Sequence, residues 1–224
     1  MSPEDFDRLR KQRAIADEIE RQLRYDYSHA LIDDYGKLVD SLQKMLNNFN
    51  SVRGTVQGLL KDACWIIYRL FDIREVAIGL KSKNDGLFRY EIFIGYRKDT
   101  EEAHRNLTYT NDDFFNSNLY HGRKISENTL IFLAEDQPFV EDEALTYNRP
   151  VMLTRIERKS PEESLQADYL NILIFDRRKQ LIGWIETSGT KKDKIPDVRT
   201  IKLIELIGSI IGVALKSEIT LRRR

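Results

Sequence analysis

The chain has 224 residues, and its 36 Lys and Arg balance its 36 Asp and Glu, so the formal net charge is zero. Nucleic-acid binders usually carry a basic excess, because neutralised phosphates supply much of their affinity, so the balance argues against such a partner. One cysteine, Cys64, excludes an intramolecular disulfide framework, and no apolar run reaches the roughly 20 residues of a membrane span. We therefore expect a cytoplasmic protein without a membrane span.

The N-terminal region is predicted to be helical. Its first residues, Ser2-Pro3-Glu4-Asp5, combine a capping side chain, a proline tolerated at the first helical position and acids that suit the positive end of the helix dipole. No further proline precedes Leu70. Apolar residues recur there at helical spacing, mostly every fourth position: Phe6, Leu9, Ala16, Ile19, Leu23, Tyr27 and Leu31.

From Tyr35 to Leu70 the apolar residues alternate intervals of three and four, a pattern typical of a coiled coil or helical bundle. In the second part, Val56–Leu70, extra apolar residues flank this seam and predict packing on the chain's own sheet. In the first part the apolar face is narrow and favours a partner helix, through Leu38, Leu42, Met45 and Phe49. A kink or break could lie near Gly36 or near Gly54.

Beyond Asp72 the period changes from helical to extended. Five segments have the composition of strands: Glu75–Leu80, Tyr90–Tyr96, Val151–Thr154, Leu170–Phe175 and Leu181–Glu186. Asp85-Gly86 predicts a hairpin between the first two, and a short helix is predicted over Val140–Tyr147. Because hairpins outnumber βαβ units, the order predicts an α+β domain with an antiparallel sheet.

The last helix is predicted from about Val198 to the end of the sequence. Its apolar residues cover more than one face, so it should meet a sheet on one side and another helix on the other. We expect Ile207 and Ile211 to join the N-terminal seam in a homodimer interface with twofold symmetry. The alternative is a monomer whose N-terminal arm folds back on its own domain.

Three stretches, taken in order, resemble the GAF domain family. Asn148-Arg149-Pro150-Val151 looks like the family's step into its third strand. Asn171–Glu186 is similar to its central hairpin, with the recurring Leu181-Ile182-Gly183, and Ile195–Leu215 resembles its closing loop and C-terminal helix. The resemblance covers roughly residues 52–219.

The resemblance implies a six-stranded antiparallel sheet with terminal helices on one face and a ligand pocket on the other, dimerisation through those helices, and a sensory role. The chemistries of particular members transfer poorly. The Asn-Lys…Phe…Asp-Glu signature of cyclic-nucleotide binders is incomplete, because Thr187-Ser188 stand near the Asn position and the Phe is missing. Methionine sulfoxide reduction needs several cysteines, and bilin attachment needs one near the pocket, whereas Cys64 lies beside the helical seam.

The segment 86–148 is rich in Phe and Tyr, which either line a pocket or fill the space between sheet and loops. Tyr120-His121-Gly122-Arg123 is its strongest polar cluster, and Arg with His suits an anionic ligand, although a solvated loop would have the same composition. The candidate ligand-binding residues are Tyr90, Tyr96, Tyr109, Phe115, Tyr120, His121 and Arg123.

The sequence shows no Ser-His-Asp order, P-loop or HExxH motif, so we predict no catalytic residue, no metal and no cofactor. The predicted function is a non-catalytic sensory or regulatory module that binds a small ligand, forms a homodimer and serves a fused or separate signalling output domain. The alternatives are a structural homodimerisation module with a collapsed pocket and a catalytic GAF relative. The predicted domains are a signalling helix over 1–51, a GAF-like domain over 52–219 and a basic tail over 220–224.

Overall fold

A computed structural model describes residues 18–26, 34–116, 122–136 and 158–221 of the chain. Internal contacts divide the chain into two units, Met1–Lys44 and Met45–Arg224, and the second unit holds the whole sheet. Several predictions fall outside the described residues: the helix start at Ser2, the helix over Val140–Tyr147, the strand over Val151–Thr154, and the site candidates Tyr120 and His121.

The described residues of the N-terminal region hold helical segments, and the last two of these are separated by the non-helical residues 51–55. Their bounds are residues 18–26, α2 Asp34–Asn50 and α3 Val56–Leu70. Thr55 caps α3, because its side-chain oxygen accepts a hydrogen bond from the backbone N–H of Gly58 at 3.0 Å. The apolar seam is therefore interrupted at Ser51–Thr55, where the break expected near Gly54 lies.

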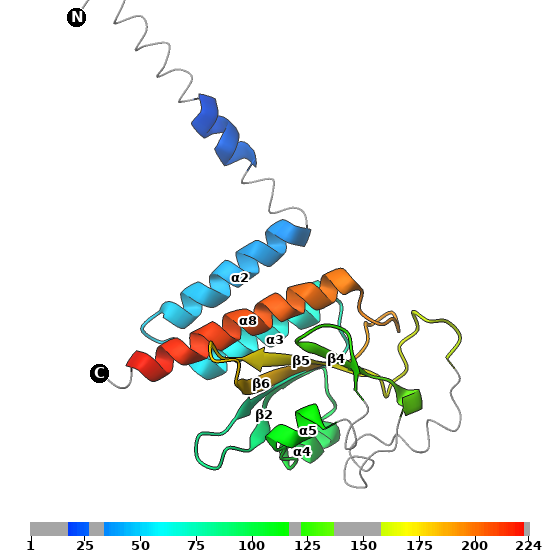
Figure 1. Ribbon diagram of the computed structural model, residues 1–224. Coiled ribbons are helices and arrows are strands. Elements are labelled where there is room, and N and C mark those ends of the chain that lie inside the picture. Colours follow the sequence, from blue (N-terminus) through cyan, green and yellow to red (C-terminus); the bar gives the residue numbers. More distant parts are fainter. Residues whose placement is uncertain (1–17, 27–33, 117–121, 137–157, 222–224) are drawn as a thin grey trace, which may run out of the picture. The chain divides into compact units, whose positions relative to one another are not determined.

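Six strands form one antiparallel sheet in the order β2-β1-β6-β5-β4-β3 (Figure 1). Their bounds are β1 Val76–Lys81, β2 Phe88–Ile94, β3 Arg123–Lys124, β4 Thr129–Phe132, β5 Tyr169–Phe175 and β6 Leu181–Thr187. The predicted six-stranded antiparallel sheet is confirmed, and four of the strands expected from the sequence lie within a residue or two of β1, β2, β5 and β6. The sequence reading missed β3 and β4.

Two helices, α3 and α8 (Val198–Leu221), pack on one face of the sheet and against each other (Figure 1). In α8, Ile204, Ile207 and Ile211 are fully buried, and each such side chain contributes roughly 1.5–3 kcal/mol. The expected placement of the terminal helices on one face of the sheet is thus confirmed. None of the helices among the described residues combines the length and the apolar character that a membrane span requires.

The opposite face carries two short helices, α4 Lys98–Arg105 and α5 Asn111–Phe115, which lie below the sheet in Figure 1. A capping box starts α5: the Thr110 side chain accepts from the backbone of Asp113, and the Asp113 carboxylate accepts from the Thr110 backbone N–H at 2.6 Å. Backbone hydrogen bonds between Phe88 and Tyr109 tie the segment between α4 and α5 to β2. These ties bring the aromatic residues after β2 back over the sheet.

Candidate functional site

The strand register decides which side chains share the face opposite α3 and α8. Glu186 lies opposite Asn171 of β5, and Trp184 lies opposite Gly79 of β1. Because alternate residues of a strand point the same way, Trp184 and Glu186 stand on this face, while Ile185 lies against α8. A Cβ at Gly79 would come within 2.0 Å of the Trp184 ring, so the glycine makes room for the indole.

Aromatic rings from separate segments surround Trp184 on this face. Their centroids lie 4.8 Å away for Tyr90, 5.1 Å for Phe114, 5.7 Å for Tyr109 and 6.3 Å for Phe88. These separations suit edge-to-face and tilted ring contacts. Trp184 and Phe88 are almost completely buried, so part of the predicted aromatic lining serves as core.

A carboxylate lies within this aromatic layer. Glu186 is only 3% exposed, and it accepts hydrogen bonds from the hydroxyl of Tyr90 at 2.7 Å and of Tyr96 at 3.1 Å. Ala77 and Asn171 are its neighbours on the adjacent strands, and neither brings a charge. Tyr90 and Tyr96, which are candidates from the sequence, therefore both contact Glu186, which is not one of those candidates.

His104 completes the polar part of this face. The residue belongs to α4 and is fully buried, with ring centroids 5.2 Å from Tyr90, 5.4 Å from Tyr96 and 5.9 Å from Phe93. Its Nδ1 lies 2.7 Å from the backbone oxygen of Thr100, one helical turn earlier. Because a carbonyl oxygen can only accept, the Nδ1 of His104 carries the hydrogen in this contact.

The structure brings together only part of the predicted site. Tyr90, Tyr96 and Tyr109 meet around Trp184, Glu186 and His104. Phe115 is 56% exposed, and its neighbour Phe114 occupies the inner position instead. Arg123 belongs to β3, at the sheet edge opposite β2, which is roughly 24 Å across the intervening strands.

Three residues of this face were missed from the sequence: Glu186, His104 and Asn171. The spacing of Trp184 and Glu186 in β6 is the one feature that could have identified Glu186, since two residues apart in a strand means one shared face. His104 lies in the part of the sequence where the resemblance places the pocket, but it reaches the site from a helix, so no strand spacing identified its contacts. Among the described residues, no group of three His, Cys, Asp or Glu side chains is placed to hold a metal ion.

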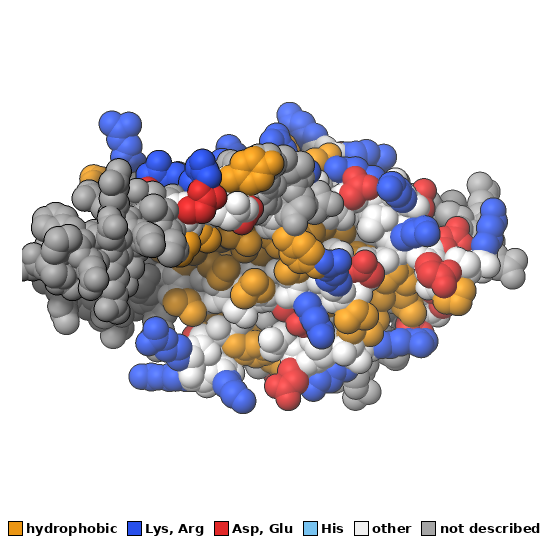
Figure 2. Space-filling view, turned by 90° about the horizontal axis from the view of Figure 1, so that it is seen from above, with side chains coloured by type: hydrophobic (Ala, Val, Ile, Leu, Met, Phe, Trp, Pro, Cys, Tyr) orange, Lys and Arg blue, Asp and Glu red, His pale blue; other side chains and the backbone are white. Residues whose placement is uncertain are grey.

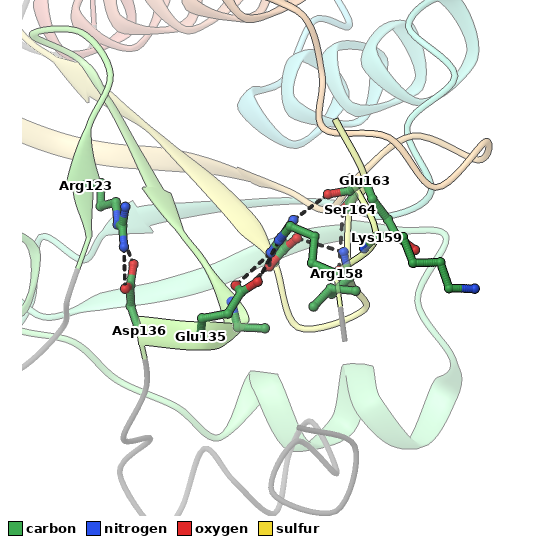
Figure 3. Close-up of polar contacts among 10 residues, drawn as sticks. Arg123, Glu135, Asp136, Arg158, Lys159, Glu163 and Ser164 are labelled. Carbon is green, nitrogen blue, oxygen red and sulfur yellow. Dashed lines mark hydrogen bonds and ion pairs between the residues drawn. The ribbon is translucent and has the colours of Figure 1, made fainter. Parts of the chain in front are cut away.

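Arg123 takes part in a separate set of ion pairs, shown in Figure 3. Its guanidinium pairs with Asp136 at 2.6 Å. Nearby, Arg158 pairs with Glu135 at 2.6 Å and with the buried carboxylate of Asp168 at 2.9 Å. The hydrogen bond from Arg158 lowers the pKa of Glu135, and Glu135 in turn raises that of Arg158.

Asp168 is the most highly connected residue among the partners of Arg158. Its carboxylate also accepts backbone hydrogen bonds from Ala134 at 2.9 Å and Leu165 at 2.7 Å. The arrangement joins the 3₁₀ helix η1, Ala134–Asp136, to the segment before β5. With three donors on its two oxygens, Asp168 fixes the local structure of this segment.

The residues predicted for a dimer interface are mostly covered within one chain. In α2, Leu38 and Met45 are buried, whereas Leu42 and Phe49 are half-buried. Ile207 and Ile211 of α8 are completely buried in the single chain, where α8 packs on the sheet and on α3. Neither side chain therefore has surface to offer a partner in the single chain, and the dimer interface stays a prediction.

No family model matches the sequence, and no curated protein matches it either. Solved structures do match. A GAF domain/HD domain protein from Geobacter sulfurreducens has 14% identity and a TM-score of 0.52, with 74% of this chain and 94% of that chain covered. The GAF domain of an Acinetobacter phosphoenolpyruvate-protein phosphotransferase has 10% identity and a TM-score of 0.52, over 84% and 98%.

A third match is a domain of a putative two-component sensor histidine kinase protein from Sinorhizobium meliloti 1021. It has 12% identity and a TM-score of 0.51, with 78% of this chain and 99% of that chain covered. The sheet order, the helices on one face and the aromatic layer on the other define an α+β domain with two unlike faces. Its fold is the GAF fold.

Proposed function

We propose that the chain is a non-catalytic sensory or regulatory GAF module that binds a small ligand on the sheet face opposite α3 and α8. The observation that carries the proposal is the buried Glu186 carboxylate, held by Tyr90 and Tyr96 among aromatic rings. Acids are almost never fully buried unless partners compensate the loss of water. A few placed polar groups among aromatic side chains are the usual composition of a small-molecule site.

The similar structures support a signalling role. One is part of a putative sensor histidine kinase, and another comes from a protein that joins a GAF domain to an HD domain. By analogy, this module would report to a fused or separate output domain. Cys64 is completely buried, and burial raises the pKa of its thiol. A catalytic role for this thiol is therefore no part of the proposal.

Native mass spectrometry of the freshly purified full chain tests the ligand proposal. We expect a small extra mass that disappears on denaturation and is lost in Glu186→Gln, because the amide keeps one acceptor oxygen where the carboxylate offers Tyr90 and Tyr96 one each. Glu205→Gln is the matched control. Glu205 likewise accepts hydroxyl hydrogen bonds, from Ser126 and from Thr129 at 2.6 Å, but on the helical side of the sheet.

The outcome separates the two leading functions. Equal loss of the mass from both variants would contradict the proposed site. A parent chain with no extra mass would favour a second candidate, a structural homodimerisation module with a collapsed pocket. That candidate has support in the burial of Trp184 and Phe88, which are 1% and 0% exposed and leave the middle of the face filled.

The proposal includes a homodimer formed through the terminal helices, with the interface moved from Ile207 and Ile211 to the outer side of α8. Leu206 and Val213, seven residues apart, are 47% and 55% exposed there. A groove of about 410 Å³ runs beside them, lined by Leu46, Phe49, Asn50, Ser209, Ile210, Val213 and Ala214. Figure 2 shows apolar side chains exposed between charged borders on the face seen from above.

A further inference from the structure

Asn171 is buried, and its side-chain oxygen has no hydrogen-bond partner among the described residues. It is 8% exposed, and its Oδ1 makes no hydrogen bond within the described part of the chain. The residue lies in the middle of β5, opposite Glu186 on one side and Leu130 on the other. It therefore stands on the same face of the sheet as Trp184, next to the proposed ligand site.

An asparagine is unusual at this position in both its strand preference and its burial. The rest of the strand core is apolar, namely Leu170, Ile172, Leu173 and Ile174, and Asn is disfavoured in strands. Burying a polar group without a partner costs stability that an apolar residue of similar size would not cost. Buried polar residues that disagree with the pattern of the surrounding strand are found mainly at functional positions.

In the described part of the chain, two other buried side-chain polar atoms lack partners, and their surroundings differ. The Arg74 guanidinium has one unpartnered nitrogen, but its other terminal nitrogen pairs with Asp193 at 2.5 Å. The Thr187 hydroxyl belongs to the helical side of the sheet, opposite Val76 and Leu170. Of these three residues within the described part of the chain, Asn171 is the one on the face of the aromatic layer, where its neighbours Leu130 and Tyr169 are half-buried.

The chemistry of a carboxamide defines what it can recognise. It presents one acceptor and one N–H donor side by side, and its best complement is a planar group with the same pair reversed, as in a carboxamide or a lactam. A planar ligand of this kind would also stack on the neighbouring rings. Opposite positions in an antiparallel pair lie roughly 5 Å apart, so a ligand bonded to Asn171 would lie beside Glu186.

We propose that Asn171 selects the ligand of this face, and that the ligand is a small, neutral, planar molecule with an amide-type donor and acceptor. The inference rests on the proposed function, since it names the ligand class of the same site. It departs from the anionic ligand suggested by Arg123 in the sequence, because the Arg123 guanidinium, two strands away in β3, already pairs with Asp136.

Three probes with one ring and different charges test the inference: benzamide, benzoate and benzylammonium. Their binding to the intact chain would be followed by NMR shifts of the backbone and of the Trp184 side-chain N–H. We expect benzamide to bind at least tenfold more tightly than either charged probe. In Asn171→Leu that preference should vanish, with benzamide weakened at least tenfold.

Thr187→Val is the matched control, because it also removes a buried polar group that lacks a partner, but from the opposite face. It should bind benzamide as the parent does. In the absence of probe, Asn171→Leu should unfold at the same urea concentration as the parent or at a higher one. A marked fall in that midpoint would make Asn171 a structural residue and overturn the inference.

The remaining outcomes are also decisive. If benzoate binds as well as benzamide, or if Asn171→Leu keeps the preference, the face binds ligands but Asn171 does not select them. If a molecule co-purifies with the parent while none of the three probes binds, the amide class is wrong and the proposed function survives. If no molecule co-purifies and no probe binds, both the proposed ligand-binding function and the role of Asn171 are contradicted.

Discussion

Asp197 shows how one side chain can set the start of the longest helix. It directly precedes α8, and its carboxylate accepts a hydrogen bond from the backbone N–H of Thr200 at 2.7 Å. This bond lowers the pKa of Asp197, since it favours the charged form. The residue is exposed, so its effect comes from capping rather than from burial.

We predict that Asp197→Ala lowers the free energy of unfolding by about 1 kcal/mol at neutral pH. Because the folded-state pKa lies below the unfolded one, the stabilisation is complete above an unfolded pKa of about 3.9 and is lost as pH falls through the folded value. Urea titrations between about pH 7 and pH 3 should therefore show the gap between parent and variant closing on acidification. Asp197→Asn, which keeps the acceptor oxygen without the charge, should differ from Asp197→Ala by an amount that does not change with pH.

At the site, the sequence identified residues better than it identified their contacts. Tyr90, Tyr96 and Tyr109 were found because aromatic residues are conspicuous in a polar segment. Glu186 and Asn171 were not found, since their roles depend on strands that are far apart in the sequence. Period-two alternation shows that Trp184 and Glu186 share a face, but not which face of the sheet meets the helices.

Among the elements, α8 carries two glycines with different surroundings. A Cβ at Gly208 would meet Ile174 and Ile185 at 3.6 Å, which is ordinary van der Waals contact. A Cβ at Gly212 would come within 2.7 Å of the backbone oxygen of Phe175. The helix therefore lies closest to the sheet at Gly212, where a backbone atom cannot move aside cheaply.

We predict opposite effects for alanine at these two positions. Gly208→Ala should raise the free energy of unfolding by up to about 1 kcal/mol, because alanine favours the helix and the space exists. Gly212→Ala should lower it by about 1–3 kcal/mol, because α8 must move away from β5. Urea denaturation of both variants measures the difference, and similar effects in the two would show that the close approach at Gly212 is unimportant.

The errors at this scale have physical causes. β3 has two residues, both exposed, and so offers no periodicity to detect. The seam from Tyr35 to Leu70 keeps its spacing across Ser51–Thr55, yet the helix stops there. At Gly54 a Cβ would lie 1.9 Å from the backbone oxygen of Phe49, so the chain turns tightly at this glycine. The apolar spacing predicts which faces of α2 and α3 are apolar, but it does not predict where one helix ends and the next begins.

For the whole molecule, the open question is how many chains assemble. We predict a dimer at micromolar concentration, since Leu206 and Val213 expose apolar surface that a second α8 can bury. Val213→Glu should give a monomer in sedimentation equilibrium, because it places a charge in that surface. Val198→Glu is the control. Val198 is 65% exposed on the same helix, about 22 Å away along the helix axis, and should leave the dimer intact.

A parent chain that sediments as a monomer would contradict the interface and favour an arm that covers its own domain. The sequence alone could not choose between these outcomes. It showed that α8 is apolar on more than one side, and the structure shows that Ile204, Ile207 and Ile211 are buried within the chain while Leu206 and Val213 are exposed.

The pairing of β1 with β6 has a consequence for how the protein is made. Val76 pairs with Thr187, so the centre of the sheet joins positions separated by about half of the chain. During synthesis the β1–β2 hairpin leaves the ribosome with the inner edge of β1 unpaired, and β6 follows several seconds later at about 5–20 residues per second. An open strand edge can pair with other chains. The nascent protein is therefore most prone to aggregate in that interval, and a chain that stops before β6 would never leave it.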